Sequence, residues 1–267
     1  MKPIGQEEIK SILCDLLHDV ADFCEESGLR YFLAYGTLIG AVRHNGFIPW
    51  DDDIDIAMPR PDYDKFVRSY NNRKSSKRVI DIAIDKNYGI PYAKVYDDRT
   101  WFNEYKYRKE KYGVFIDIFP IDGIKGNWQI YKALVLTKLL HAKKANYIQR
   151  SLVKNLINTF AKIVLLPLSV RNILKLLDKN ARTCPFGSTP QAVNLLETYG
   201  FCEIADSSVF EKTLFHEFEG DYYRIPVGYD EWLRSIYGDY MQLPPVVQQI
   251  THHIYQVYWK DDDNKIK

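Results

Sequence analysis

Three acidic residues at alternate positions have the clearest chemical meaning in this sequence. Asp51, Asp53 and Asp55 lead into the short apolar stretch at residues 54–58. Side chains on a β-strand repeat every two residues, so a strand that begins near Asp53 would direct Asp53 and Asp55 to one face. Two like charges about 7 Å apart along a strand are unfavourable unless a cation lies between them. Hard divalent metals prefer such oxygen ligands, so the pattern indicates metal-dependent chemistry on phosphate.

A third carboxylate, Asp117, lies inside the apolar segment at residues 114–119. An unpaired charge in apolar surroundings is costly, so we expect Asp117 to complete the metal site with Asp53 and Asp55. Two plainer interpretations remain open. The acidic run could be a solvated turn, and Asp117 could be a single carboxylate that is hydrogen-bonded at the end of a strand.

Further residues near these carboxylates are suited to bind phosphate. Gly36 and Thr37 follow a short apolar segment and open a helical one, and backbone N–H groups at such a helix start can hold a phosphate. Arg43 and Lys94 are candidate phosphate ligands, because a transferred phosphoryl group needs cations around it; ordinary surface charge is the alternative for both. Asp51 is placed with this substrate-binding group.

The elements that must position these residues alternate between helices and strands. Apolar residues recur at helical spacing over Gln6–Ser27, with Glu7 and Glu8 in the first turn and Gly28 at the exit. This order predicts an α+β fold with a mixed sheet and flanking helices. Strands are predicted at residues 31–35, from about 53, at 79–84, 93–96 and 114–119, the last ended by Pro120, and helices at 38–43 and 61–70.

A basic helical segment interrupts this pattern. Residues 125–182 contain twelve Lys or Arg and one acidic residue, a net charge of +11, whereas the rest of the chain carries −10. Within it, residues 151–164 predict a strongly amphipathic helix. Lys154 and Lys162 exclude a transmembrane span there. The segment either packs its apolar face on the core or docks on anionic lipid of the cytoplasmic leaflet.

These features divide the chain and limit its class. Hydrophobic residues make up 46% and charged residues 27%, which is typical of a soluble globular protein. The net negative charge outside the basic segment argues against a nucleic-acid partner. Four cysteines without a CxxC motif, and a start without an apolar core, indicate a reduced cytoplasmic location. We predict a catalytic core at 1–124, a basic helical insertion at 125–185, a part at 186–260 that completes the catalytic domain, and a flexible tail at 261–267.

Four motifs resemble the LicD family. They are residues 31–44 (YFLAYGTLIGAVRH), 46–55 (GFIPWDDDID), 113–120 (GVFIDIFP) and 237–245 (YGDYMQLPP). The resemblance covers most of the chain, although residues 125–194 match no family pattern. One departure is Tyr35, where many members have a second glycine. His252 and His253 lack carboxylates at metal-binding spacing, so we expect them to be structural or substrate-side rather than a zinc site.

The resemblance implies a nucleotidyltransferase-like fold, similar to that of the fukutins, and a magnesium-dependent transferase. Family members move phosphocholine or a similar phospho-alcohol from a CDP-linked donor to a hydroxyl of a cell-surface glycan, such as lipopolysaccharide or teichoic acid. The resemblance also implies that Asp53, Asp55 and Asp117 are the catalytic residues and bind magnesium, with Gly36 and Thr37 as the phosphate-holding turn. Two Mg²⁺ ions, or Mn²⁺, would bridge the diphosphate, and Asp117 would be the base or a metal ligand.

Two other functions stay open at this point. One is a nucleotidyltransferase that uses CTP or another nucleoside triphosphate on a small molecule, because that chemistry uses the same fold and metals. The other is a non-catalytic glycan- or nucleotide-binding module, although the presence of all three carboxylates disfavours it. For the transferase, we expect a peripheral position on the inner face of the cell membrane, where a polyprenol-linked glycan acceptor would be held.

Overall fold

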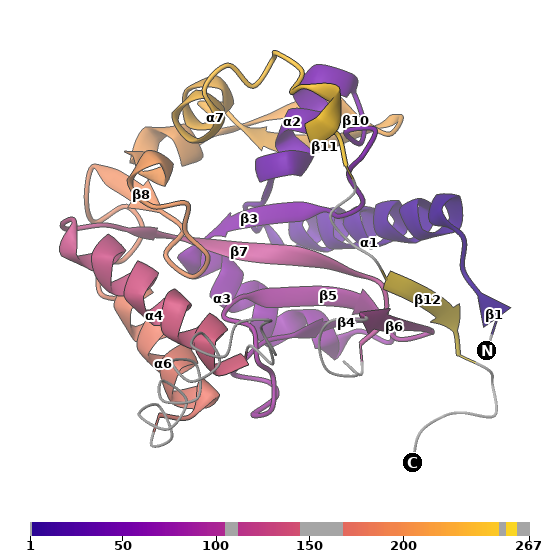
Figure 1. Cartoon of the computed structure of the whole chain (residues 1–267), viewed down its shortest axis with the longest axis horizontal. Helices are drawn as coiled ribbons and strands as arrows, with labels where there is room; N and C mark the ends of the chain where they lie inside the picture. Colours follow the sequence, from indigo (N-terminus) through magenta and orange to yellow (C-terminus); the bar gives the residue numbers. More distant parts are fainter. Residues whose placement is uncertain (1, 105–111, 145–167, 251–254, 261–267) are drawn as a thin grey trace, which may run out of the picture.

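A seven-stranded mixed sheet forms the centre of the molecule (Figure 1). The structure is a computed structural model that describes residues 2–104, 112–144, 168–250 and 255–260. Strand β3 runs parallel to β7, and the other neighbouring strands are antiparallel. The α+β prediction is therefore confirmed. The strand order is β2 (Phe32–Leu33), β3 (Asp55–Pro59), β7 (Phe115–Gly123), β5 (Ala93–Asp97) and β4 (Lys77–Ile80), with β8 (Gln191–Val193) paired to β7 and β9 (Ala205–Asp206) paired to β8.

Helices α1 (Gln6–Ser27) and α3 (Arg60–Ser69) pack on this sheet. Helix α1 has the predicted bounds because its apolar residues recur on one face and are buried. It ends at Gly28, whose φ of 63° lies in the left-handed region that glycine adopts without steric cost. Figure 1 shows α1 lying behind β3 and β7. Other elements pack at the ends of β3 and β7.

A second group of elements lies beside β2 and β3. It contains α2 (Tyr35–His44), the hairpin of β10 (Thr213–Phe218) and β11 (Asp221–Pro226), and α7 (Tyr229–Tyr237). Trp232 of α7 is fully buried and packs edge-on against Phe32 and Phe210. Figure 1 shows this group above β3. Residues that follow the basic segment therefore return to the N-terminal core.

The described part of the basic segment consists of α4 (Trp128–Lys144) and α6 (Val170–Ala181), which pack against each other. The apolar face of α6 is buried, with Ile173 and Leu177 fully enclosed. None of the described helices is long and apolar enough to cross a membrane. The predicted helix at 151–164, His252 and His253, and the tail at 261–267 lie outside the described residues. The domain limits stay a prediction.

A smaller three-stranded sheet completes the described fold. Its strands are β1 (Lys2–Pro3), β12 (Tyr255–Trp259) and β6 (Thr100–Glu104), all antiparallel. Short 3₁₀ helices lie at Tyr70–Asn72, Phe201–Glu203, Ser207–Phe210 and Val246–Gln248.

The boundaries of four predicted strands differ in the structure. Strand β3 begins at Asp55 rather than near Asp53. Strand β2 is shorter than predicted, because Tyr35 already begins α2. Strand β4 stops at Ile80, because the Asp81 carboxylate accepts the N–H of Ala83 and turns the chain.

Strand β7 does not stop at Pro120 but continues to Gly123. Its pairing with β5 ends at Ile118, so Pro120 lies where no neighbour on that side needs its missing N–H. The longer strand pairs with β8 at Asp122 and Gly123.

Candidate functional site

Two of the predicted carboxylates lie at the same level on adjacent strands. Asp55 is the first residue of β3, and its register partner on the parallel strand β7 is Asp117. The Asp117 N–H donates to the Ile54 carbonyl, with an N···O distance of 2.9 Å. Paired residues of neighbouring strands share a face of the sheet, and the strands lie about 4.8 Å apart. The two carboxylates are therefore close neighbours.

The first turn of α2 adjoins this pair. The Asp55 N–H donates to the Thr37 hydroxyl at 2.8 Å, so the helix start fixes the start of β3. A Cβ atom on Gly36 would lie 2.7 Å from a carboxylate oxygen of Asp51, so a side chain at this position would displace the Asp51 carboxylate. The structure thus brings Gly36, Thr37 and Asp51 together with Asp55, in the turn that the sequence predicted for phosphate binding.

The carboxyl groups of this cluster resist ionisation. Burial, followed by the charges of Asp53, Asp117 and Asp51, raises the pKa of Asp55 well above its usual range. Burial and the neighbouring Asp53 raise the pKa of Asp51 to about 7. The pKa of Asp117 is raised by burial, against the opposing effect of Lys94. The cluster therefore concentrates negative charge that a cation would relieve.

The donor chemistry of this cluster suits a hard divalent metal. Carboxylate oxygens in excess over local positive charge are what Mg²⁺ and Mn²⁺ bind. No three acidic, His or Cys side chains converge into a complete metal cluster within the part of the chain that the structure describes. The Asp117 side chain is engaged by Lys94 instead.

Lys94 is a buried cation inside the site. It is the register partner of Asp117 across β5 and β7, and its Nζ lies 2.5 Å from the Asp117 carboxylate. The same Nζ lies 3.5 Å from the centroid of the Phe115 ring, and only 4% of the residue is exposed. Lys94 thus adjoins the acidic cluster as the sequence predicted, but it is paired with a carboxylate.

The structure does not bring Arg43 to the carboxylates. It lies eight residues after Tyr35, about 12 Å along the axis of α2. Its guanidinium donates to the Tyr240 carbonyl at 2.5 Å and to His44 at 2.9 Å. Arg43 therefore connects two of the sequence motifs. A phosphate-binding role for Arg43 stays a prediction that this position does not support.

The later part of the chain adds acidic and aromatic residues to the site that were not predicted. The pKa of Glu197 is raised by desolvation and then by the charge of Asp117. The pKa of the Tyr199 phenol is raised by burial, with Asp55 among the contributing charges, and the same holds for Tyr237. Of these residues, only Tyr237 belongs to one of the motifs. Glu197 and Tyr199 follow β8, and no local sequence pattern indicates that β8 pairs with β7.

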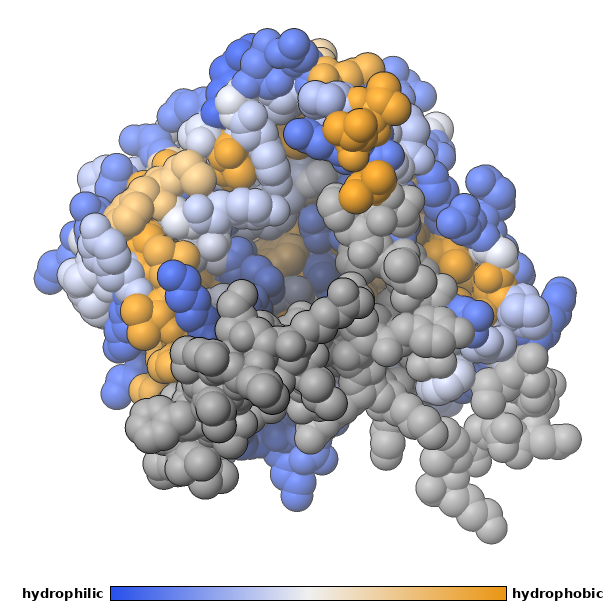
Figure 2. Space-filling model, viewed as in Figure 1, coloured by the Kyte–Doolittle hydropathy of each residue, from blue (hydrophilic) through white to orange (hydrophobic). Residues whose placement is uncertain are grey.

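The surface is hollowed on the face that Figure 2 shows. Figure 2 shows the hollow near the middle of this face, below the part that Figure 1 assigns to α7 and beside α4. Hydrophilic and apolar residues both line its depth. A hollow with polar groups in its lining suits a small-molecule ligand.

Comparison with known proteins agrees with this geometry. Residues 28–167 match the LicD/FKTN/FKRP nucleotidyltransferase domain. The chain is 32% identical over 266 residues to the lipopolysaccharide cholinephosphotransferase LicD of Haemophilus influenzae, covering 97% of this chain and 99% of the relative. Shorter similarity, 46% identity over 39 residues, joins 15% of this chain to 8% of the ribitol 5-phosphate transferase FKRP of human and mouse. The chain belongs to the LicD family of phosphotransferases, with the nucleotidyltransferase fold.

Proposed function

We propose that this enzyme transfers phosphocholine, or a closely similar phospho-alcohol, from a CDP-linked donor to a hydroxyl of a cell-surface glycan. The observation that carries the proposal is the register of Asp55 and Asp117 across β3 and β7, beside the start of α2. This arrangement sets two carboxylates next to a turn where a diphosphate can lie. The near full-length similarity to a lipopolysaccharide cholinephosphotransferase supports the choice of substrate.

The proposal includes magnesium held by Asp53, Asp55 and Asp117. The support is the mutual repulsion among these carboxyls and Asp51, which raises the pKa of Asp55. Bound magnesium would neutralise the diphosphate and make the acceptor hydroxyl more acidic. The remaining catalytic effect would come from the position and the charge of residues of the chain.

The roles of the chain's own residues follow from their places. The first turn of α2 orients the donor phosphates through its free N–H groups. Lys94 balances Asp117 and places positive charge beside the transferred group. Asp117, whose carboxyl has a raised pKa, would act either as a magnesium ligand or as the base that takes the proton of the acceptor hydroxyl. The walls of the hollow limit access of water, which would otherwise compete as acceptor.

Product analysis separates this proposal from nucleotidyl transfer. Purified enzyme is incubated with CDP-choline or with CTP, with a glycan acceptor and magnesium. We expect CMP to be released from CDP-choline and phosphocholine to appear on the glycan. Release of pyrophosphate from CTP would identify a nucleotidyltransferase instead. Binding of either nucleotide without any product would identify a binding module.

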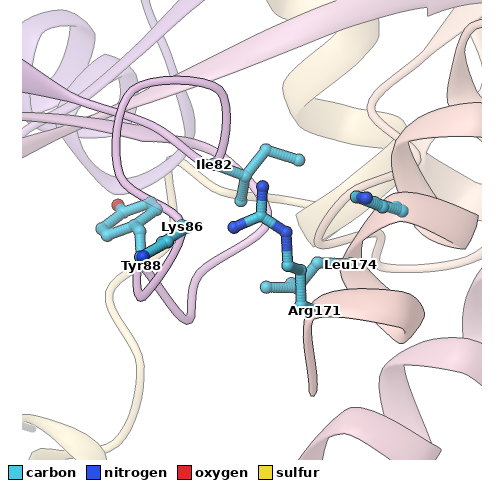
Figure 3. Close-up of a pocket in the computed structure, with 6 residues that line it drawn as sticks. Ile82, Lys86, Tyr88, Arg171 and Leu174 are labelled. Carbon is cyan, nitrogen blue, oxygen red and sulfur yellow. The ribbon is translucent and has the colours of Figure 1, made fainter. Parts of the chain in front are cut away.

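The proposal also places the enzyme on an anionic membrane surface. Support comes from a shallow pocket between the loop after β4 and the first turns of α6, which Figure 3 shows with Arg171 reaching toward Ile82. Lys86, Arg171 and Lys175 supply three cationic side chains at this pocket. Cations grouped in this way attract lipid phosphate by about 1 kcal/mol each. Such contact would hold the enzyme near a lipid-linked acceptor.

Sedimentation with vesicles tests the membrane contact. The triple variant Lys86→Glu, Arg171→Glu, Lys175→Glu should bind anionic vesicles less than wild type at low salt. Binding of wild type should weaken as salt rises. A control that changes three exposed cations elsewhere, Lys2, Lys65 and Lys212, should bind as wild type does. Equal sedimentation of all three proteins would contradict the membrane contact.

A further inference from the structure

Tyr35 has an unusual conformation beside the acidic cluster. It is the first residue of α2, and its φ of 47° lies in the left-handed region, which is sterically unfavourable for a residue with a side chain. Residues on both sides of it are bonded to the backbone of Asp55. The Ala34 N–H donates to the Asp55 carbonyl at 3.0 Å, and the Asp55 N–H donates to the Thr37 hydroxyl at 2.8 Å. The conformation of Tyr35 therefore sets where this segment holds Asp55.

Two buried side chains hold the hydroxyl of Tyr35. The hydroxyl donates to the Glu203 carboxylate and accepts from the Asn194 side-chain amide at 3.0 Å. Both partners are fully buried. The Leu196 N–H donates to the side-chain oxygen of Asn194 at 3.0 Å, which leaves the NH₂ group of that amide for Tyr35. The hydroxyl therefore has a matched acceptor and a matched donor.

These two partners belong to a loop that is fixed at both ends. Asn194 directly follows β8, and Glu203 ends a 3₁₀ helix two residues before β9. Strand β8 pairs with both β7 and β9. The second carboxylate oxygen of Glu203 accepts the N–H of Tyr199 at 2.8 Å, within the same loop. The loop thus presents two fixed polar groups to a tyrosine that precedes them by 159 and 168 positions.

Packing of the Tyr35 ring does not require these hydrogen bonds. The ring lies 5.3 Å from that of Phe119 and 5.4 Å from that of Trp232, and a phenylalanine would make the same contacts. Burial of a carboxyl and an amide is costly unless both are hydrogen-bonded. A strained backbone persists only where its surroundings over-determine it, and such strain is concentrated at active sites. A need to hold Tyr35 in one position accounts for the polar pair.

We infer that Glu203 and Asn194 are positioning residues of the phosphotransferase: through the Tyr35 hydroxyl they fix the backbone that carries Asp55. Neither residue needs to touch the transferred group. A small displacement of a catalytic carboxylate is enough to lower the rate by about ten- to hundredfold. The inference rests on the proposed function for the catalytic role of Asp55.

Hydrogen exchange and kinetics of Tyr35→Phe test this role. Because the variant removes only the hydroxyl, we expect the Asp55 amide to exchange at least about tenfold faster than in wild type, and kcat for CMP release from CDP-choline to fall about tenfold. Tyr70→Phe is the matched control, since the Tyr70 hydroxyl donates to the Asp19 carboxylate and only 1% of the residue is exposed. The control should lose stability to urea as Tyr35→Phe does, but keep wild-type exchange at Asp55 and wild-type kcat.

Double variants test whether the two residues act through the hydroxyl. Asn194→Ala and Glu203→Ala should each lower kcat about tenfold, but by less than about twofold when Tyr35→Phe is already present. Losses that multiply would show that the two residues act by another route, and would overturn the inference. If Tyr35→Phe does not fold, Asn194→Ala, which keeps the ring and the hydroxyl of Tyr35, is compared with Tyr70→Phe in the same way.

The outcomes separate this role from the proposed function. Where wild type releases CMP, the proposed function stands. The positioning role is then overturned by wild-type exchange and kcat in Tyr35→Phe, by a change in only one of the two quantities, or by an equal loss of kcat in Tyr70→Phe. If wild type releases no CMP, the proposed function falls and the exchange of the Asp55 amide decides the positioning role. Faster exchange in Tyr35→Phe than in Tyr70→Phe would support that role, and equal exchange would overturn it.

Discussion

A group of charged side chains lies at each end of the paired strands β3 and β7. The two groups differ in how far positive charge offsets negative charge. At one end, Asp55 faces Asp117, and Lys94 is the cation beside them. Immediately beyond the other end of β3, Arg60 donates two hydrogen bonds to Asp122 of β7, at 2.8 and 2.5 Å. The Arg60 and Asp122 side chains are 6% and 0% exposed. At the Arg60–Asp122 end, positive and negative charges offset each other. At the Asp55–Asp117 end, negative charge is in excess.

The balanced end also has further partners. Asp178 of α6 lies 3.4 Å from Arg60, and Arg182 bonds to both Asp178 and Asp64. This network joins α6 of the basic segment to the core. Buried ion pairs of this kind contribute to structure only while both partners are present. Buried charge alone therefore does not mark a functional site. An excess of negative charge over nearby positive charge does.

The largest expected effect is on activity at the acidic end. Asp55→Asn should lower kcat/KM by at least roughly 10³-fold, because it removes a proposed magnesium ligand. The melting temperature of the metal-free protein should not fall, because the change relieves repulsion with Asp117 and Asp53. Steady-state kinetics and thermal unfolding check both parts. Full activity in this variant would remove Asp55 from the mechanism.

The opposite pattern is expected at the balanced end. Asp122→Ala should lower the free energy of unfolding by about 3–5 kcal/mol, because it leaves the Arg60 charge buried without its partner. Urea unfolding measures the loss. The double variant Arg60→Met, Asp122→Leu should recover most of it, since an apolar pair needs no compensation. A single variant as stable as wild type would show that Arg60 is neutralised by Asp178 alone.

Lys94 sharpens the comparison from within the acidic end. Lys94→Met should lower kcat/KM by roughly 10²-fold, because positive charge beside the transferred phosphoryl group is lost. It also leaves Asp117 without its cation, so magnesium should raise the melting temperature more in this variant than in wild type. Thermal unfolding with magnesium or EDTA gives the comparison. An equal magnesium shift in both proteins would mean that Lys94 and the metal do not share Asp117.

A further expected effect is a pH dependence of stability from Asp51. Its pKa is raised from an ordinary value of 3.8 to about 7. A carboxyl with a raised pKa in the folded state stabilises fully at low pH, and that contribution is lost as pH rises through the folded pKa. The difference in unfolding free energy between wild type and Asp51→Asn, measured without metal, should therefore fall as the pH rises from about 4 to 7. Urea unfolding at several pH values in EDTA measures this difference, and a constant difference would contradict it.

The elements set by local pattern were predictable from the sequence. Helix α1 follows from its apolar spacing and from Gly28, and Asp55 and Asp117 follow from acids embedded in apolar strands. The errors arose where a neighbour in space decides. Pro120 lies within β7 because the pairing of β7 with β5 ends at Ile118. The residues around Pro120 do not indicate where that pairing ends.

The rest of the site depends on contacts between distant segments. Glu197 and Tyr199 reach the carboxylates because β8 pairs with the far end of β7, about seventy residues earlier in the chain. Lys94 was placed near the site by sequence, but its pairing with Asp117 depends on the antiparallel register of β5 and β7. Arg43 shares a motif with the site residues, yet the length of α2 carries it away from them.

Tyr35 combines a strained backbone conformation with a buried hydrogen-bond network. Its φ of 47° lies in the left-handed region, where a side chain costs about 1–2 kcal/mol that glycine avoids. The tyrosine is retained here together with Asn194 and Glu203, which hold its hydroxyl. Glycine at this position would remove both the strain and the ring beneath Tyr199. The three positions should therefore vary together among related chains.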